Sequence, residues 1–116
     1  MNGLKFRSGA TDGSRDIYWV TFNKPDKRRP VLILTRTSAI RELNAVVVAS
    51  ITSTIREVES QVLLDVEDGM LEECVVNLDN IQTVAKTRLE SYITHLPSGK
   101  MAEIFEAINF AFGIDK

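Results

Sequence analysis

The sequence predicts an α+β fold, in which a strongly curved antiparallel sheet is followed by one C-terminal helix. Short runs rich in β-branched and aromatic residues recur between residues 16 and 96, separated by turn-forming residues. A long run with helical spacing of its apolar residues follows, at residues 98–112. Short strands with tight connections and a single terminal helix are typical of α+β domains.

The first two strands are expected at residues 16–22 and 30–34. Residues 31–34 are apolar on both faces, as in a buried central strand. Pro30 lacks a backbone N–H, so we place it at the first residue of this strand. Arg28 and Arg29 would then be held where the strand meets a loop, and fixed guanidinium groups there can bind an anion such as phosphate. The alternative is that both arginines are simply solvated.

The middle of the chain is expected to contain one short helix and several strands. Residues 37–44 predict one or two helical turns that begin with a hydroxyl cap. A buried strand at residues 45–50 leads into a cluster of hydroxyl groups at residues 52–54, whose usual role is hydrogen bonding within a turn. Later strands are expected at residues 61–65, 74–78, 81–84 and 92–96, with a turn at Asp68-Gly69 and a break near Asp79-Asn80.

The terminal helix is expected to follow Pro97, with Ser98 as its N-cap, and to end at Gly113. Phe110 falls on the face opposite the apolar stripe and is a candidate contact for a partner. The predicted core-facing stripe consists of Met101, Ile104, Phe105, Ile108 and Phe112.

Size and composition indicate a single domain at residues 15–116, preceded by a disordered lead-in at residues 1–14. A domain this small leaves much of its surface uncovered, so a homodimer is expected. No apolar run is long enough to cross a bilayer, so no membrane association is expected. The single cysteine, Cys74, cannot form an internal disulfide, which favours a cytoplasmic location.

Charge is distributed unevenly along the chain. Residues 1–56 contain ten Lys/Arg and four Asp/Glu, a net charge of +6, whereas residues 57–116 have a net charge of −8. The whole chain carries −2. This asymmetry favours one surface that faces a polyanion, unless folding mixes the two halves.

The residue types exclude several kinds of catalytic site. His95 and Cys74 are the only residues of their types and are far apart in sequence, so no metal site is predicted. The sequence has no glycine-rich phosphate loop and no recognised nucleophile motif, so no cofactor is predicted. We therefore expect His95 to be structural or superficial and Cys74 to be a small buried hydrophobic residue.

Several stretches, taken in order, resemble the MazF/PemK/Kid family of toxin endoribonucleases. The strand that begins Arg29-Pro30-Val31-Leu32 and the later strand that ends Ile51-Thr52-Ser53 carry most of the resemblance, which extends over residues 16–114. It implies an SH3-like barrel of the CcdB/PemK toxin fold, assembled as a homodimer. In that family single-stranded RNA crosses the dimer surface, and a segment of a cognate antitoxin occupies the same groove. The other matching stretches are residues 16–20, 74–84 and 86–89 and the terminal helix.

The resemblance also implies roles for individual residues. Arg29 and Thr52 match the catalytic positions, and Ser53 is placed to assist. The implied reaction is metal-independent, sequence-selective cleavage that leaves a 2′,3′-cyclic phosphate and a 5′-hydroxyl. The residues expected to bind RNA or border its path are Lys24, Lys27, Arg28, Arg36, Ser53, Asp79 and Asn80.

The chain departs from the family pattern in two places, and the shorter loop before the Arg-Pro pair makes it a short-loop variant. The usual glycine-rich loop with a glutamate before the Arg-Pro pair is missing, and Arg15 replaces the glycine that usually precedes the acidic residue of strand one. Arginine is a poor general base because it does not readily lose its proton. Asp79, Asp16 and solvent remain the candidates for the base.

Two other functions remain open at this point. The chain could be a CcdB-like gyrase poison, although Phe112 stands where that poison carries a tryptophan. It could also be a degenerate family member that binds RNA or antitoxin without cleaving RNA. Trp19 or Tyr18 could stack on a base, but aromatic residues of a first strand more often belong to the core.

Overall fold

The computed structural model describes residues 13–23 and 27–114. Lys24 and most of the predicted lead-in lie outside the described residues. Two short 3₁₀ turns, η1 at Val66–Asp68 and η2 at Lys86–Arg88, accompany two helices, α1 at Thr37–Ile40 and α2 at Ser98–Phe112. The strands are β1 Asp16–Thr21, β2 Arg28–Ile33, β3 Ala45–Thr52, β4 Gln61–Leu64, β5 Cys74–Ala85 and β6 Leu89–His95.

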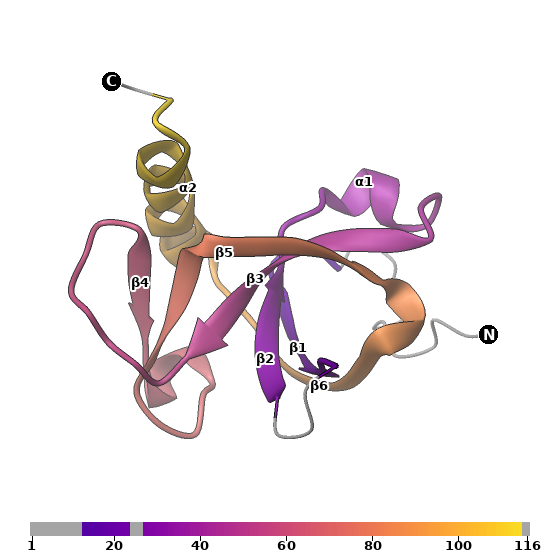
Figure 1. Cartoon of the computed structure of the whole chain (residues 1–116), viewed down its shortest axis with the longest axis horizontal. Helices are drawn as coiled ribbons and strands as arrows, with labels where there is room; N and C mark the ends of the chain where they lie inside the picture. Colours follow the sequence, from indigo (N-terminus) through magenta and orange to yellow (C-terminus); the bar gives the residue numbers. More distant parts are fainter. Residues whose placement is uncertain (1–12, 24–26, 115–116) are drawn as a thin grey trace.

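All six strands form one antiparallel sheet in the order β4-β5-β3-β2-β1-β6 (Figure 1). The sheet is strongly curved and open, with β4 and β6 at its edges. The C-terminal helix α2 packs against β4 and β5 at one end of the sheet. The predicted α+β fold is confirmed.

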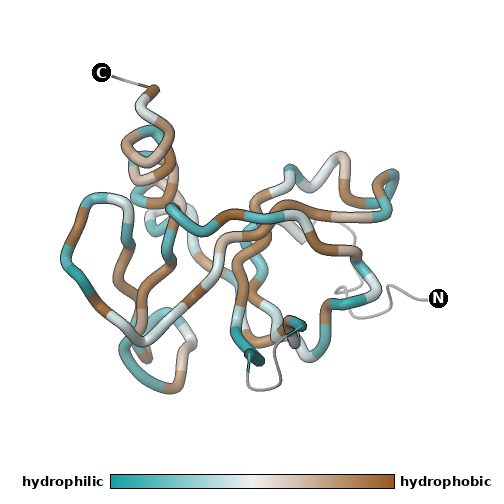
Figure 2. The backbone as a smooth tube through the Cα atoms, in the orientation of Figure 1, coloured by the Kyte–Doolittle hydropathy of each residue, from teal (hydrophilic) through white to brown (hydrophobic). Residues whose placement is uncertain are grey.

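Hydrophobic residues recur along the strands, as the brown segments show (Figure 2). Their side chains form buried clusters on both faces of the sheet. Ile17, Leu32 and Ile51 belong to the larger core cluster, which is closed by Met101 and Ile104 of α2. The opposite face carries a second cluster of buried residues: Tyr18, Val20, Val31, Ile33, Ile40, Val46, Val48, Val84 and Leu89.

Several predicted strand boundaries are wrong, and the last strand, β6, begins at Leu89 rather than at residue 92. Pro30 is the third residue of β2, not the first. This position tolerates proline because β2 pairs with β3 only from Val31 onward, so at Pro30 only the β1 side of the strand is paired. The predicted break near Asp79-Asn80 does not occur either, because β5 continues through it and absorbs the extra residues as a bulge.

Both predicted hydroxyl caps are also wrong. Arg36 occupies the N-cap of α1 and Pro97 that of α2, and neither makes a side-chain cap hydrogen bond. Ser98 is the first residue of α2 instead. The predicted end of α2 is confirmed, because Gly113 adopts φ 69° and its N–H donates to the carbonyls of Asn109 and Phe110.

The core-facing stripe of α2 is narrower than predicted. Met101, Ile104 and Ala107 are buried, whereas Phe105 and Phe112 are 56% and 60% exposed. The helix contacts only one end of the sheet, so the small Ala107 faces the strands and the two phenylalanines lie outside the contact.

Candidate active site and RNA-binding surface

Arg29 and Thr52 lie opposite each other on neighbouring strands. The antiparallel register of β2 and β3 ends with Val31 opposite Ser50. Continued by two residues, the same register places Arg29 opposite Thr52. Paired hydrogen bonding has stopped at this point, and both residues line the same polar cavity. The end of the ladder therefore presents a guanidinium and a hydroxyl group across an open gap.

A bulge in β5 brings a carboxylate to the same gap. Ala49 of β3 pairs with Ile81, but the next residue, Ser50, pairs with Asn77. Residues 78–80 of β5 are therefore extra relative to β3, and such bulges often redirect side chains beside active sites. Leu78 turns into the core, whereas Asp79 and Asn80 are exposed.

Ser60, in the turn that leads into β4, holds the bulge in place. Its carbonyl accepts a hydrogen bond from the Leu78 N–H at 2.8 Å, and its hydroxyl donates to Asp79 Oδ2 at 2.6 Å. Asn77 Oδ1 accepts from the Asp79 N–H at 3.0 Å. Ser60 is only 2% exposed, so the Asp79 carboxylate is held by a buried and well-packed donor.

The central polar cavity, which we define as the space of about 450 Å³ that joins these groups, holds the predicted catalytic pair. Arg29 of β2, Thr52 of β3, and Asp79 and Asn80 of the bulge all line it. Its further lining residues are Ser50, Thr54, Arg56, Val58, Gln61 and Asn77. The cavity thus combines two guanidinium groups, hydroxyl groups, amides and one carboxylate, which suits a phosphodiester group.

A second space, the basic cavity, adjoins it at Arg29 and has a volume of about 410 Å³. Lys27, Arg29 and Arg88 supply three cationic side chains to its lining. The Arg88 guanidinium lies over the Phe22 ring at 5.9 Å from the centroid and donates to the Thr21 carbonyl at 2.6 Å. These contacts hold Arg88 in place at the edge of a surface that can follow a phosphate backbone.

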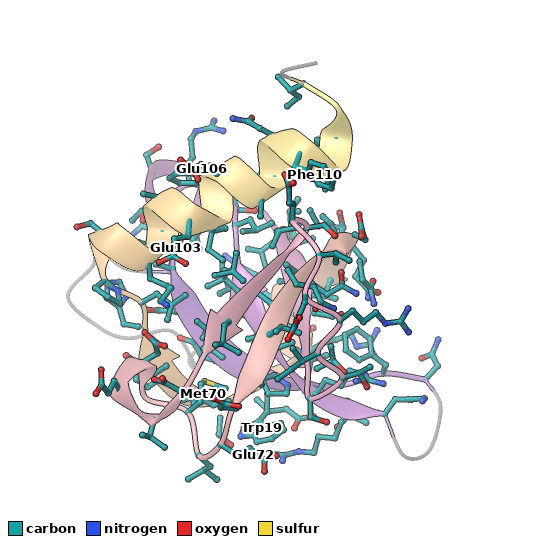
Figure 3. All side chains as sticks on the ribbon, turned by 90° about the vertical axis from the view of Figure 1, so that its left-hand side faces the viewer. Trp19, Met70, Glu72, Glu103, Glu106 and Phe110 are labelled. Carbon is teal, nitrogen blue, oxygen red and sulfur yellow. The ribbon has the colours of Figure 1, made fainter. Side chains whose placement is uncertain are left out.

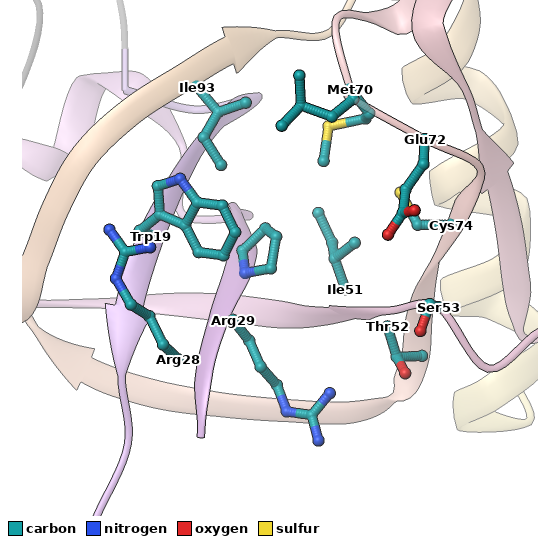
Figure 4. Close-up of a pocket in the computed structure, with 12 residues that line it drawn as sticks. Trp19, Arg28, Arg29, Ile51, Thr52, Ser53, Met70, Glu72, Cys74 and Ile93 are labelled. Carbon is teal, nitrogen blue, oxygen red and sulfur yellow. The ribbon is translucent and has the colours of Figure 1, made fainter. Parts of the chain in front are cut away.

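A third space, the tryptophan cavity, has a volume of about 300 Å³ and lies on the other side of Arg29 and Thr52. Trp19 and Glu72 face each other across it, and the Arg29 side chain extends from β2 toward Thr52 below them (Figure 4). The cavity is otherwise mostly apolar, lined by Pro30, Ile51, Met70, Leu71 and Ile93. Trp19, Met70 and Glu72 lie at the end of the molecule opposite α2 (Figure 3).

Arg28 and Arg29 have different surroundings although they are adjacent in sequence. The Arg28 guanidinium lies 4.3 Å from the Trp19 ring centroid, and its Nε donates to Glu90 Oε1 at 3.0 Å. The hydrogen bond from Thr21, followed by the interaction with Arg28, lowers the pKa of Glu90 below its ordinary value of 4.5. The ion pair between Arg28 and Glu90 therefore persists at neutral pH and is lost only as the pH falls through the lowered pKa of Glu90. The side chain of Arg29, in contrast, makes no ion pair or hydrogen bond within the described part of the chain.

Cys74 lines the tryptophan cavity as an un-ionised thiol. Burial raises its pKa to about 11, and the negative charges of Glu72, Asp68 and Asp65 add to the effect. A thiol with this pKa is a weak nucleophile near neutral pH.

Comparisons with known proteins agree with this arrangement. Residues 14–112 match the family model described as "PemK-like, MazF-like toxin of type II toxin-antitoxin system". The chain belongs to this family. A curated relative of this MazF-like toxin, "Endoribonuclease MazF3" of Mycobacterium tuberculosis, is 40% identical over 90 residues, which is 78% of this chain and 87% of the relative.

Solved structures of MazF toxins share the fold of this MazF-like toxin. The "Mycobacterium tuberculosis toxin MazF-mt6" superposes with a TM-score of 0.80 at 37% identity, covering 88% of this chain and all of that one. The "Endoribonuclease in complex with its cognate antitoxin from Mycobacterial species" superposes with a TM-score of 0.79 at 25% identity, covering 90% and 98%.

The structure of this MazF-like toxin gathers most of the site residues predicted from sequence. Arg29, Thr52, Asp79 and Asn80 share the central polar cavity. Arg28 and Ser53 line the tryptophan cavity, and Lys27 lines the basic cavity. Arg36 lies beyond the opposite end of β2, at the start of α1, and lines none of these three cavities.

His95 has structural partners that the sequence did not indicate. Its Nδ1 lies 2.7 Å from Asp16 Oδ1, and its Nε2 lies 3.0 Å from the Arg15 guanidinium. Arg15 adopts φ 75°, so the position keeps the left-handed conformation for which glycine is better suited. Asp16 is fully buried and Tyr18 lies in the second core cluster, so neither side chain faces the three cavities.

Three residues of the site were missed in the sequence. Ser60 supports Asp79, Arg88 contributes to the basic cavity, and Glu72 faces Trp19. Each lies in a loop or a 3₁₀ turn, and no local sequence pattern predicts that residues in such segments will reach the site. Among the residues that the structure describes, no three His, Cys, Asp or Glu side chains gather as metal ligands. None of the described helices is long and apolar enough to span a membrane.

Proposed function

We propose that this chain is an endoribonuclease toxin of a type II toxin–antitoxin system, which cleaves single-stranded RNA selectively and without a metal ion. The observation that carries the proposal is that Arg29 and Thr52 face each other across the central polar cavity, beside a held carboxylate. The names of the curated relatives, which are endoribonucleases, support the same reaction class.

RNA supplies its own nucleophile in this mechanism. The 2′ oxygen attacks the adjacent phosphorus, the bond from phosphorus to the 5′ oxygen breaks, and the products are a 2′,3′-cyclic phosphate and a 5′-hydroxyl. Negative charge grows on the non-bridging phosphate oxygens during the attack. Arg29 and Thr52 donate hydrogen bonds to these oxygens, and preorganised donors of this kind are a major source of catalysis.

The general base in this proposal is Asp79. Ser60 holds Asp79 Oδ2, which leaves the other carboxylate oxygen to take the proton from the 2′-hydroxyl. Asp16 is unsuitable because it is fully buried, bonded to His95 and located at the other end of β1. The leaving 5′ oxygen takes its proton from water.

RNA approaches this site through the basic cavity. Lys27 and Arg88 contact backbone phosphates on one side of the scissile group, and Asn80 lies between this cavity and the central polar cavity. An amide at that junction can hydrogen-bond to a base that is splayed out of a single strand.

The experiment that tests this function is single-turnover cleavage of a mixed-sequence RNA, with the end groups of the products identified. We expect 2′,3′-cyclic phosphate and 5′-hydroxyl ends, with the same rate in the presence of EDTA. Products with 3′-hydroxyl ends, or cleavage that stops in EDTA, would contradict the mechanism. Inhibition of DNA supercoiling without RNA cleavage would instead support the gyrase-poison alternative.

A cognate antitoxin is the proposed protein partner. One solved relative was determined as an endoribonuclease in complex with its cognate antitoxin, which supports the same kind of partner here. An acidic segment that folds on binding would complement Lys27, Arg29 and Arg88 along the basic cavity. Such a segment should compete with RNA, and simultaneous binding of both would argue against a shared surface.

A homodimer is the proposed assembly. The terminal helix exposes several large apolar side chains, and Phe110 lies on its outer side (Figure 3). Sedimentation should give twice the chain mass of 13.0 kDa. Phe110→Glu should shift the protein toward monomer, whereas an unchanged mass would place the interface elsewhere. The exposed residues of the helix are Phe105, Phe110 and Phe112, and Ile114, just beyond its end, is also exposed.

A further inference from the structure

The tryptophan cavity has the features of a binding site for a single base. Its volume of about 300 Å³ is at the lower end of the range for small-ligand sites. The Trp19 ring and the Arg28 guanidinium above it are flat surfaces on which a base can stack. Arg29 and Thr52 line this cavity as well as the central polar cavity, so a nucleotide next to the phosphate they hold would reach it.

Glu72 gives this mostly apolar cavity a polar group. It lies in the bend before β5 and lines the side of the cavity opposite Trp19 (Figure 4). Within the described residues its carboxylate accepts no hydrogen bond, so both oxygens remain open to a ligand. A carboxylate only accepts hydrogen bonds, so it favours a base that offers donors.

We propose that the tryptophan cavity binds the base next to the scissile phosphate, and that Glu72 selects guanine there. This inference rests on the proposed function, because it needs RNA at Arg29 and Thr52. The Watson–Crick edge of guanine presents N1–H and the N2 amino group side by side, which matches the two oxygens of a carboxylate. Adenine, cytosine and uracil each lack two adjacent donors at that edge, so one carboxylate oxygen would face an acceptor.

An apolar side chain of an antitoxin is the rival occupant of the same cavity. A base is favoured for two reasons. Arg28 and Glu72 lie at opposite sides of the cavity and provide polar selectivity that an apolar side chain would not use. The cavity also shares Arg29 and Thr52 with the proposed phosphate site.

The single tryptophan of the chain gives a direct assay. Short RNAs with 2′-O-methyl groups cannot be cleaved, because the nucleophile is blocked. Four such RNAs that differ only in one base at the nucleotide next to the central phosphate are titrated while Trp19 fluorescence is recorded. We expect the emission to change on binding and the guanine RNA to bind about tenfold more tightly or better, since a bidentate base contact is worth about 1–3 kcal/mol.

The informative variant is Glu72→Gln. Glutamine offers one donor and one acceptor, and all four bases present a donor beside an acceptor at this edge, so the preference for guanine should be lost. Glu73→Gln is the matched control, because it removes the same charge one residue away and lines none of the three cavities. It should leave the guanine preference unchanged.

Several outcomes would overturn the inference. Equal affinity for the four RNAs, or a guanine preference that survives in Glu72→Gln, would remove the selective role of Glu72. A Trp19 signal that responds to an antitoxin peptide but not to RNA would assign the cavity to the antitoxin. A uniform loss of cleavage rate in Glu72→Gln, with base preference unchanged, would make Glu72 part of the chemistry instead.

Failure of this inference is distinguishable from failure of the proposed function. If the wild type cleaves mixed-sequence RNA but shows no base preference at this nucleotide, the nuclease proposal stands and the base site does not. If it binds guanine RNA selectively but never cleaves any RNA, the base site stands and the nuclease proposal fails.

Discussion

Replacing Arg29 by alanine is the most direct test of the proposed chemistry. Arg29 lines all three cavities, so its guanidinium is the group most central to the surface that RNA would cover. Its side chain lies at the end of the β2–β3 ladder, and the backbone pairing of Arg29 with Val20 does not depend on it. Arg29→Ala should therefore fold normally, with an unchanged midpoint of thermal unfolding.

The expected loss of rate follows from the donors that are removed. Deleting one preorganised donor to a developing oxyanion typically costs on the order of 10²–10³ in rate. Arg29 supplies a planar pair of donors and a full charge, so we expect at least this loss in the single-turnover rate at saturating enzyme. Arg29→Lys should recover little, because an ammonium group cannot reproduce the planar fork.

Arg28→Ala is the matched control. Its guanidinium is already engaged by Glu90 and lies over Trp19, so it is not available to the phosphate. Exposed ion pairs contribute at most about 1 kcal/mol. We therefore expect the single-turnover rate of Arg28→Ala to fall less than about tenfold, while RNA affinity weakens.

The assay is single-turnover cleavage at saturating enzyme, which separates the chemical step from RNA affinity. Full activity of Arg29→Ala would refute the proposed mechanism. Equal losses in Arg28→Ala and Arg29→Ala would show that the two arginines act as one electrostatic patch, and the distinction drawn from their contacts would then be wrong.

Three further predictions concern the general base Asp79, the path of the RNA over the protein, and the Cys74 thiol. Asp79→Asn should slow the single-turnover rate by about 10²–10⁴-fold, as expected for loss of a general base, and a rate independent of this change would return the role to solvent. Replacing Lys27 and Arg88 together by glutamine should reduce the salt dependence of RNA affinity, whereas Arg36→Gln should leave it unchanged because Arg36 lies beyond the far end of β2. Since the pKa of Cys74 is about 11 rather than 9.0, its contribution to stability is complete below pH 9.0 and is lost as the pH rises toward 11. Thiol absorbance should titrate near the higher value in the folded protein, and a midpoint near 9.0 would contradict this environment.

The fold could be predicted from the sequence because strand and helix patterns are local. Residues 31–33 are apolar on both faces and form the buried second half of β2, and Gly113 ends α2 as its position indicates. The errors arose where tertiary contacts override local patterns. Asp79-Asn80 has the composition of a turn, but Ser60 holds the preceding residues against the neighbouring strand, and β5 continues as a bulge.

The site could be predicted only in part for the same reason. Resemblance to the family identified Arg29 and Thr52, and the register of β2 and β3 now gives a physical reason for their pairing. Ser60 and Glu72 carry no sequence signal, because a serine or glutamate in a loop is ordinary until the fold places it beside Asp79 or Trp19.

The alternation of side chains along β2 explains how one short strand places two adjacent arginines in different surroundings. Arg29 and Val31 point to the face that carries the second core cluster, and the same alternation on β3 puts Thr52 on that face with Ser50. Arg28 and Pro30 point to the other face, where β1 presents Trp19 opposite Pro30. A slip of one residue would exchange the two arginines between faces. The apolar residues that follow Pro30 prevent this slip, since they must stay buried in their respective clusters. The buried run of β2 therefore determines which arginine faces Thr52 and which one lies over Trp19.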